Sequence, residues 1–154
     1  MKSFAEQYIN TKYIQQKGRV SQVSLTENKK TYKAYNTNNL DLSVYQVDGG
    51  IITSTAIKKC DFAIYTETDS LYLIELKGSD YKQAIDQLCT TIDNFKTTCA
   101  KPNKVFTRIV LSKTPTPNIT QNLELKVKKK IKEFAKSSGD HNKGTKLYTE
   151  TTLV

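Results

Sequence analysis

The stretch from Lys59 to Gly78 constrains this chain most, because it places charged residues inside otherwise apolar, strand-like runs. It predicts two short strands joined by a tight polar turn. Side chains alternate between the two faces of a strand, so Glu75 and Lys77 point the same way as Leu71 and Leu73. Tyr72, Ile74 and Leu76 occupy the other face of the strand, so both faces look buried. A carboxylate and an ammonium at the end of a buried strand are costly unless something uses them.

A third charged residue, Asp61, lies at the start of the first run. Opposed residues of a hairpin share a face, so Asp61 joins the others only if it sits opposite Glu75 or Lys77. Either register leaves a three-residue loop, Glu67–Asp69 or Thr68–Ser70, and loops of that length are common in hairpins. The β-carbons of the two carboxylates would then lie roughly 5–8 Å apart.

Two carboxylates at that separation repel each other, and a cation between them would offset the repulsion. Mg²⁺ suits such a pocket, because it takes oxygen ligands from carboxylates, waters and phosphates. The backbone carbonyl of Leu76 would supply another ligand, and Lys77 would orient a water or stabilise a charged transition state. Such a metal lowers the pKa of its bound water and neutralises a scissile phosphate. Asp61, Glu75 and Lys77 therefore predict phosphodiester hydrolysis with Mg²⁺, or with Mn²⁺ as the alternative metal.

The rest of the chain predicts an α/β fold in one domain over residues 1–154. Helical spacing of apolar residues predicts helices over 3–16, 80–98 and 118–137. Strand-like runs cover 20–25, 31–36, 42–47, 51–57, 104–112 and, as an edge strand, 146–153. Asp48-Gly49 between two such runs predicts a hairpin. Residues 139–144 are expected to form a flexible loop, and the strand–helix–strand order predicts a parallel crossover.

The formal net charge of +9 favours a polyanionic partner, with nucleic acid ahead of an anionic membrane. A merely basic protein is the alternative. No run approaches the length of an apolar membrane span, and no secretory leader pattern is present. With three cysteines and no CxxC pair, we expect a cytoplasmic protein with reduced thiols and no membrane partner. The single histidine, His141, lies in a polar segment and is expected to be solvated, so a zinc site is not expected.

Asp61, thirteen intervening residues, then Glu75, one residue and Lys77, followed by a helix, resembles the PD-(D/E)XK nuclease superfamily. Its members include many restriction endonucleases, archaeal Holliday junction resolvases and repair exonucleases. The resemblance covers roughly residues 40–112 and implies a restriction-endonuclease-like core, with a central mixed β-sheet flanked by helices. It further implies that Asp61 and Glu75 bind Mg²⁺, that Lys77 acts in catalysis, that DNA is favoured over RNA, and that homodimers are frequent.

Several such families also carry an acidic residue on the first helix and a glutamine on the helix after the motif. Glu6 and Gln87 match those places loosely, and Cys60 stands where the family motif has a proline. For Glu6 the alternative to metal binding is a capping box with Ser3, and for Gln87 the alternative is a solvated helix position. Three further candidates for contact with substrate are Lys58, Lys59 and Arg108.

The sequence favours an enzyme, a metal-dependent endo- or exodeoxyribonuclease, over two alternatives. One is a catalytically silent scaffold of the same fold that binds nucleic acid or protein. The other is a small interaction or toxin-neutralising protein whose lysines contact an acidic partner. The intact set of Asp61, Glu75 and Lys77 favours the enzyme. The alternative is that Glu75 and Lys77 form a simple surface ion pair at an exposed strand end, with Asp61 as a turn residue. The lysine-rich stretch 126–136 is either a solvated helix face or a phosphate-binding surface.

Overall fold

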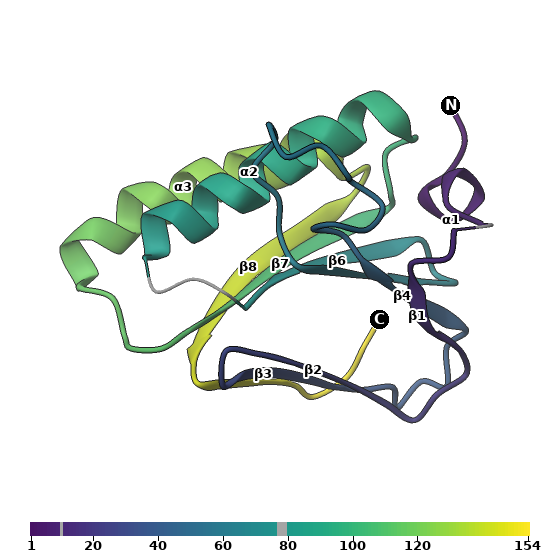
Figure 1. Ribbon diagram of the computed structural model, residues 1–154, viewed down its shortest axis with the longest axis horizontal. Coiled ribbons are helices and arrows are strands. Elements are labelled where there is room, and N and C mark those ends of the chain that lie inside the picture. Colours follow the sequence, from purple (N-terminus) through teal and green to yellow (C-terminus); the bar gives the residue numbers. More distant parts are fainter. Residues whose placement is uncertain (10, 77–79) are drawn as a thin grey trace.

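The computed structural model describes residues 1–9, 11–76 and 80–154, which form one mixed β-sheet with two long helices (Figure 1). The elements are α1 (Phe4–Gln7), β1 (Ile14–Gly18), β2 (Gln22–Glu27), β3 (Lys30–Tyr35), β4 (Leu42–Gln46), β5 (Phe62–Thr66), β6 (Ser70–Glu75), α2 (Tyr81–Thr98), β7 (Lys104–Leu111), α3 (Pro117–Phe134), β8 (Ser138–Thr145) and β9 (Leu147–Glu150). The strand order is β1-β4-β5-β6-β7-β8-β9-β3-β2. Strands β6, β7 and β8 run parallel, as do β3 and β9. The predicted α/β class, with a mixed sheet and flanking helices, is confirmed.

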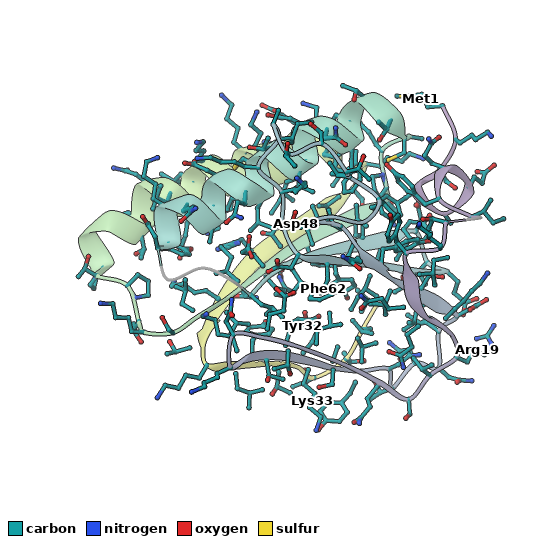
Figure 2. The ribbon with its side chains drawn as sticks, in the orientation of Figure 1. Met1, Arg19, Tyr32, Lys33, Asp48 and Phe62 are labelled. Atoms are coloured by element: carbon teal, nitrogen blue, oxygen red, sulfur yellow. The ribbon has the colours of Figure 1, made fainter. Side chains whose placement is uncertain are left out.

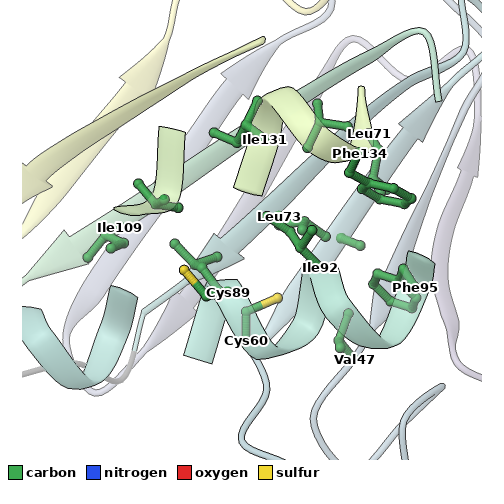
Figure 3. Close-up of a cluster of buried hydrophobic side chains, with 14 of the residues drawn as sticks. Val47, Cys60, Leu71, Leu73, Cys89, Ile92, Phe95, Ile109, Ile131 and Phe134 are labelled. Atoms are coloured by element: carbon green, nitrogen blue, oxygen red, sulfur yellow. The ribbon is translucent and has the colours of Figure 1, made fainter. Parts of the chain in front are cut away.

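Helices α2 and α3 lie side by side on one face of the sheet (Figure 1). Asp80 begins α2 by accepting the backbone N–H groups of Lys82 and Gln83, which satisfies donors that a helix start leaves open. The apolar stripe of α2, including Ile92 and Phe95, packs on Leu71 and Leu73 of β6 in the first core (Figure 3). The predicted helices over 80–98 and 118–137 and the parallel β6–α2–β7 connection are therefore confirmed. Among the described helices, none is long and apolar enough to span a membrane.

The opposite face of the sheet is covered by the sheet itself. Strands β2, β3 and β9 turn beneath β4–β7 (Figure 1), and a second core fills the space between these layers. Tyr32 of β3 and Phe62 of β5 point into this space (Figure 2). Tyr72, Ile74 and Leu76 join the same core from β6 and the residue after it. Strand β6 is therefore buried on both faces, as its sequence predicts.

The β5–β6 hairpin has the predicted three-residue loop. Thr66 pairs with Ser70 and Phe62 with Ile74, so the loop is Glu67–Asp69, the first of the two predicted alternatives. Asp69 adopts a left-handed conformation with φ 61°, which suits the last position of such a loop. Its carboxylate also accepts the Tyr65 hydroxyl at 2.5 Å.

The predicted helix over 3–16 is wrong beyond its first turn. Helix α1 ends at Gln7, and residues 14–18 form strand β1, which pairs with one edge of β4. Phe4 anchors the short helix by packing on the rings of Tyr45 and Phe95. The open edge of β4 offers backbone partners to the following segment, and such tertiary pairing overrides a weak local helical pattern.

Three strand and loop predictions are also wrong. Residues 51–57 do not pair with β4, because β1 and β5 already occupy both of its edges. Only an isolated bridge joins Asp48 to Ile52. Residues 139–144 belong to strand β8, because the open edge of β7 pairs with this segment over its whole length. Strand β9 is then an interior strand between β8 and β3, and not an edge.

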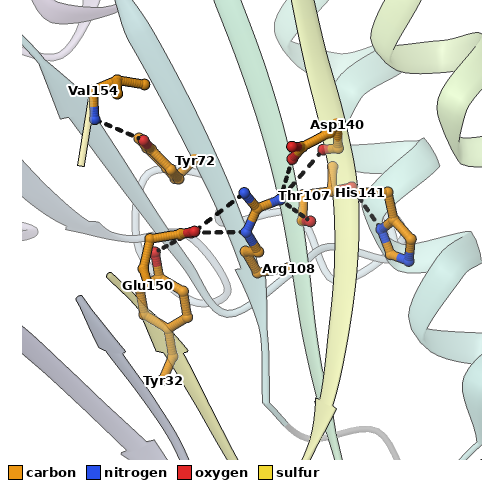
Figure 4. A network of polar contacts seen from close by, with 8 residues as sticks. All are labelled: Tyr32, Tyr72, Thr107, Arg108, Asp140, His141, Glu150 and Val154. Atoms are coloured by element: carbon orange, nitrogen blue, oxygen red, sulfur yellow. Dashed lines mark hydrogen bonds and ion pairs between the residues drawn. The ribbon is translucent and has the colours of Figure 1, made fainter. Parts of the chain in front are cut away.

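A buried arginine joins the folded-over strands to the rest of the sheet (Figure 4). Arg108 of β7, 3% exposed, donates to Glu150 of β9 at 2.7 Å and to Asp140 of β8 at 2.6 Å. Tyr32 donates to the same Glu150 carboxylate at 3.0 Å. The guanidinium also lies 5.7 Å from the ring centroid of Tyr148. One cation thus connects β7, β8, β9 and β3.

We expect Arg108→Met to lower the free energy of unfolding by about 3–5 kcal/mol, because it leaves Glu150, whose side chain is only 12% exposed, without its cation. Urea unfolding at neutral pH measures this loss. Arg19→Met is the matched control, since Arg19 pairs with Glu67 at 2.9 Å but is 54% exposed, and exposed pairs contribute about 1 kcal/mol or less. Equal losses in the two variants would show that Arg108 does not hold the layers together.

Candidate functional site

Two buried carboxylates meet where β5 begins and β6 ends. Asp61 is 2% exposed and Glu75 is 0% exposed. The β5–β6 pairing ends one residue short of them, at Phe62 and Ile74. The backbone N–H of Leu76 donates to Asp61 Oδ2 at 2.7 Å, and the N–H of Asp61 donates to the Ile74 carbonyl at 3.1 Å. These bonds fix the Asp61 side chain beside the last residue of β6.

In addition to burial, the charges of both carboxylates raise the pKa of the same buried thiol, that of Cys60. Burial raises the pKa of Cys60 well above its ordinary value, and the negative charges of Glu75 and Asp61 raise it further. Cys60 belongs to the core beneath the helices (Figure 3), and Glu75 shares the face of Leu73 by strand alternation. The predicted pair is therefore brought together on the helix-covered face of the sheet. All three cysteines are free and buried.

Helix α2 holds the backbone that delivers Asp61. Thr91 Oγ1 accepts the N–H of Cys60 at 2.9 Å. Gln87 donates from its side-chain amide to the carbonyl of Lys59 at 3.4 Å. The predicted Gln87 thus contacts the site's own backbone, one turn of helix before Thr91.

The other predicted residues lie in different surroundings. Lys77 falls outside the described residues, as do Gly78 and Ser79, so its catalytic role stays a prediction. Lys58 is exposed. Lys59 is buried, and its ammonium donates to the Ile57 carbonyl at 3.1 Å and lies 3.5 Å from Asp48. These contacts give Lys59 a structural role in the segment before Asp61.

Glu6 and Arg108 lie away from the carboxylate pair. Glu6 makes both hydrogen bonds of the capping box with Ser3, at 3.3 and 3.2 Å, so the structure favours the capping alternative. Its helix packs beside Tyr65, four residues or roughly 13 Å along β5 from Asp61. Arg108 faces the second core and is engaged by Glu150 and Asp140 (Figure 4), on the opposite side of the sheet from Glu75.

A buried chain of polar side chains on the neighbouring strands was not predicted from the sequence. His141, predicted to be solvated, is 7% exposed. It lies between the Tyr81 hydroxyl, 2.8 Å from Nε2, and the Thr107 hydroxyl, 2.7 Å from Nδ1. Tyr81 donates in turn to Glu124 at 3.2 Å, so Nε2–H donates to Tyr81 and Nδ1 accepts from Thr107. Residues 138–144 lack the β-branched side chains and the Tyr, Phe and Trp that reveal a strand, so no local signal could have placed His141 in the interior.

The donor set fits a hard divalent cation. Adjacent buried carboxylates supply the oxygen ligands that Mg²⁺ prefers. No group of three or more histidine, cysteine, aspartate or glutamate side chains gathers as a metal centre within the described part of the chain. The remaining ligands would therefore come from backbone carbonyls, waters or a bound phosphate. Compared with known proteins, the chain matches no family model, no curated protein and no solved structure.

The burial of His141 predicts a pH-dependent stability. Burial lowers the pKa of His141 to about 4 from an ordinary value of 6.5. In the unfolded chain the ring takes up a proton as the pH falls below 6.5, whereas the folded ring stays neutral until about pH 4. Stability from this residue is therefore complete above pH 6.5 and is lost toward pH 4, by about 3 kcal/mol at most.

Urea unfolding of the wild type and His141→Gln between pH 4 and 7.5 tests this expectation. The glutamine keeps a hydrogen bond toward Tyr81 but does not titrate. We expect the stability difference between the two proteins to change across pH 4–6.5 and to be constant above it. A difference that stays constant over the whole range would contradict the buried, neutral histidine.

Proposed function

We propose that this protein is a Mg²⁺-dependent nuclease that hydrolyses phosphodiester bonds, with DNA as the favoured substrate and Mn²⁺ as an alternative metal. The observation that carries the proposal is the juxtaposition of Asp61 and Glu75, both buried, on one face at adjoining strand ends. The preference for DNA rests on the resemblance to the PD-(D/E)XK nucleases.

The buried pair supports the proposal because two neighbouring carboxylates supply the oxygen ligands that a divalent cation takes. Two ionised carboxylates in a low-dielectric interior repel strongly. A bound divalent cation would offset that repulsion and, when present, would lower the pKa of a water and neutralise a scissile phosphate. Asp61 and Glu75 would hold it, and the hydrogen bond from Leu76 to Asp61 at 2.7 Å orients one carboxylate before any metal binds. Such preorganisation is what a metal site of this kind needs.

The order of elements around the pair adds support. Hairpin β5–β6, helix α2 and parallel strand β7 follow one another in the order the resemblance implies. Lys77 comes two residues after Glu75, and in the proposed mechanism its ammonium orients the attacking water or stabilises the developing negative charge. Gln87 and Thr91 keep the backbone before Asp61 in place through their contacts with Lys59 and Cys60.

A cleavage assay tests this function. Linear, nicked, branched and single-stranded DNA, and RNA, are incubated with Mg²⁺ or Mn²⁺ and the wild-type protein. We expect divalent-dependent cleavage of at least one substrate. Glu75→Gln and Lys77→Ala should each lower the rate at least about 10²-fold, because each removes charge stabilisation of the transition state.

The matched control is Glu150→Gln, which neutralises a largely buried carboxylate on the opposite side of the sheet. Its cleavage rate should stay close to that of the wild type at temperatures where both are folded. Activity that survives in both site variants would refute the site assignment. If no substrate is cleaved by the wild type, the chain is instead the catalytically silent scaffold.

A further inference from the structure

Helix α3 carries lysines on two flanks with different surroundings. On the flank that faces α2, Lys126 reaches Asp86 at 2.8 Å and Lys130 reaches Asp93 at 2.9 Å. These acidic partners neutralise the lysines and fasten the two helices together. The positive charge on this flank is therefore used within the fold.

The opposite flank keeps its charge. It carries Lys128, Lys132 and Lys136, the last just past the end of α3. All three are exposed, and no ion pair joins them to another described residue. Lys128 and Lys132 lie four residues apart on α3, so their ammonium groups lie on one side of the helix about 6 Å apart along its axis.

These lysines line a groove between α3 and the start of β8. Its floor includes Ser137, Ser138 and Gly139. A side chain at Gly139 would collide with the Val105 carbonyl oxygen and with Ile131, so the glycine allows the strand to lie close beneath the helix. Figure 2 shows nitrogen-tipped side chains projecting from the outer side of the helical layer.

The outer edge of β8 adjoins the same groove. Strand β8 pairs with β7 along residues 138–145 but with β9 only at Thr145. Over residues 138–144 no other described strand covers the second edge. The backbone N–H groups of a free strand edge are hydrogen-bond donors, as are the two serine hydroxyls. Ammonium groups, hydroxyls and backbone N–H groups are the donors that proteins use to contact phosphates.

We propose that this groove binds the sugar–phosphate backbone of the nucleic acid, with Lys128, Lys132 and Lys136 contacting successive phosphates. The net charge of +9 favours the same class of partner. Phosphate binding follows from the groove alone, whereas its service to a cleavage site rests on the proposed function.

The sheet register gives the spacing between groove and carboxylate pair along the strands. Glu75 pairs with Ile109, which pairs with Lys143, while Ser138 lies five residues earlier on β8. Five residues of strand span roughly 16 Å, or about five base pairs of duplex. A nucleic-acid strand that is cut at Asp61 and Glu75 would therefore need to extend at least about five base pairs beyond the cut to reach the groove.

The proposal is tested by nucleic-acid binding in EDTA, where cleavage does not interfere. Labelled duplex DNA, single-stranded DNA and RNA of equal length are titrated by fluorescence anisotropy at several salt concentrations. The groove variant replaces Lys128, Lys132 and Lys136 by glutamine, which keeps helix propensity. Its affinity should fall at least about tenfold for the preferred nucleic acid, and the salt dependence should weaken by about 2–3 counterions.

The matched control replaces three ion-paired lysines, Lys96 of α2 and Lys126 and Lys130 of α3, by glutamine. It removes the same charge from the helical layer, so we expect a loss of less than about threefold. Circular dichroism melting checks that both variants are folded.

Equal losses in the two variants, or no loss in the groove variant, would overturn the proposal. So would polyglutamate that competes as well as nucleic acid of equal charge, because an acidic protein would then be the better partner. Groove-dependent binding without any divalent-dependent cleavage would instead uphold the groove and refute the nuclease activity.

Discussion

Strand β6 is buried on both faces and still ends in a carboxylate. Helix α2 covers one face and the folded-over strands cover the other, so Glu75 has no exposed surface. The Leu76 N–H holds a second buried carboxylate, Asp61, beside it. Carboxylate oxygens are ligands that Mg²⁺ prefers, and the proposed divalent cation would bind at this pair. The proposed chemistry depends on this one feature.

The fold supports that feature by closing the sheet on itself. In the described part of the chain, nine strands form a single sheet whose far edge returns beneath its centre. Arg108 sits where the layers meet and is held by Glu150 and Asp140. The result is a second core on the side that the helices do not cover. Without that core Tyr72, Ile74 and Leu76 would face water.

The sequence was most informative where local pattern and tertiary context agree. The alternation over Leu71–Glu75, the loop length and the helical spacing of α2 each have a period that reveals the element directly. The length of the hairpin loop followed from the same reasoning, since Thr66 pairs with Ser70 across Glu67–Asp69. These predictions needed no knowledge of distant parts of the chain.

The sequence was least informative where an open sheet edge recruits a segment. Residues 14–18 and 138–145 become strands because β4 and β7 offer them backbone partners, and neither segment is rich in strand-forming residues. The burial of His141 and the second-core role of Arg108 follow from that pairing, so neither could be seen in advance. Conversely, residues 51–57 look like a strand but find both edges of β4 occupied. Edge availability is a property of the whole sheet and has no local signature.

The central claim, that Asp61 and Glu75 hold a divalent cation, is tested most directly by Mn²⁺ binding without substrate. Electron paramagnetic resonance counts bound Mn²⁺ in the wild type, in Asp61→Asn and in the Glu150→Gln control. We expect the wild type to bind Mn²⁺ and Mg²⁺ to displace it. The Asp61→Asn variant should bind no Mn²⁺, and the Glu150→Gln variant should bind it like the wild type. Equal binding by the wild type and Asp61→Asn, or no binding by the wild type, would contradict the central claim.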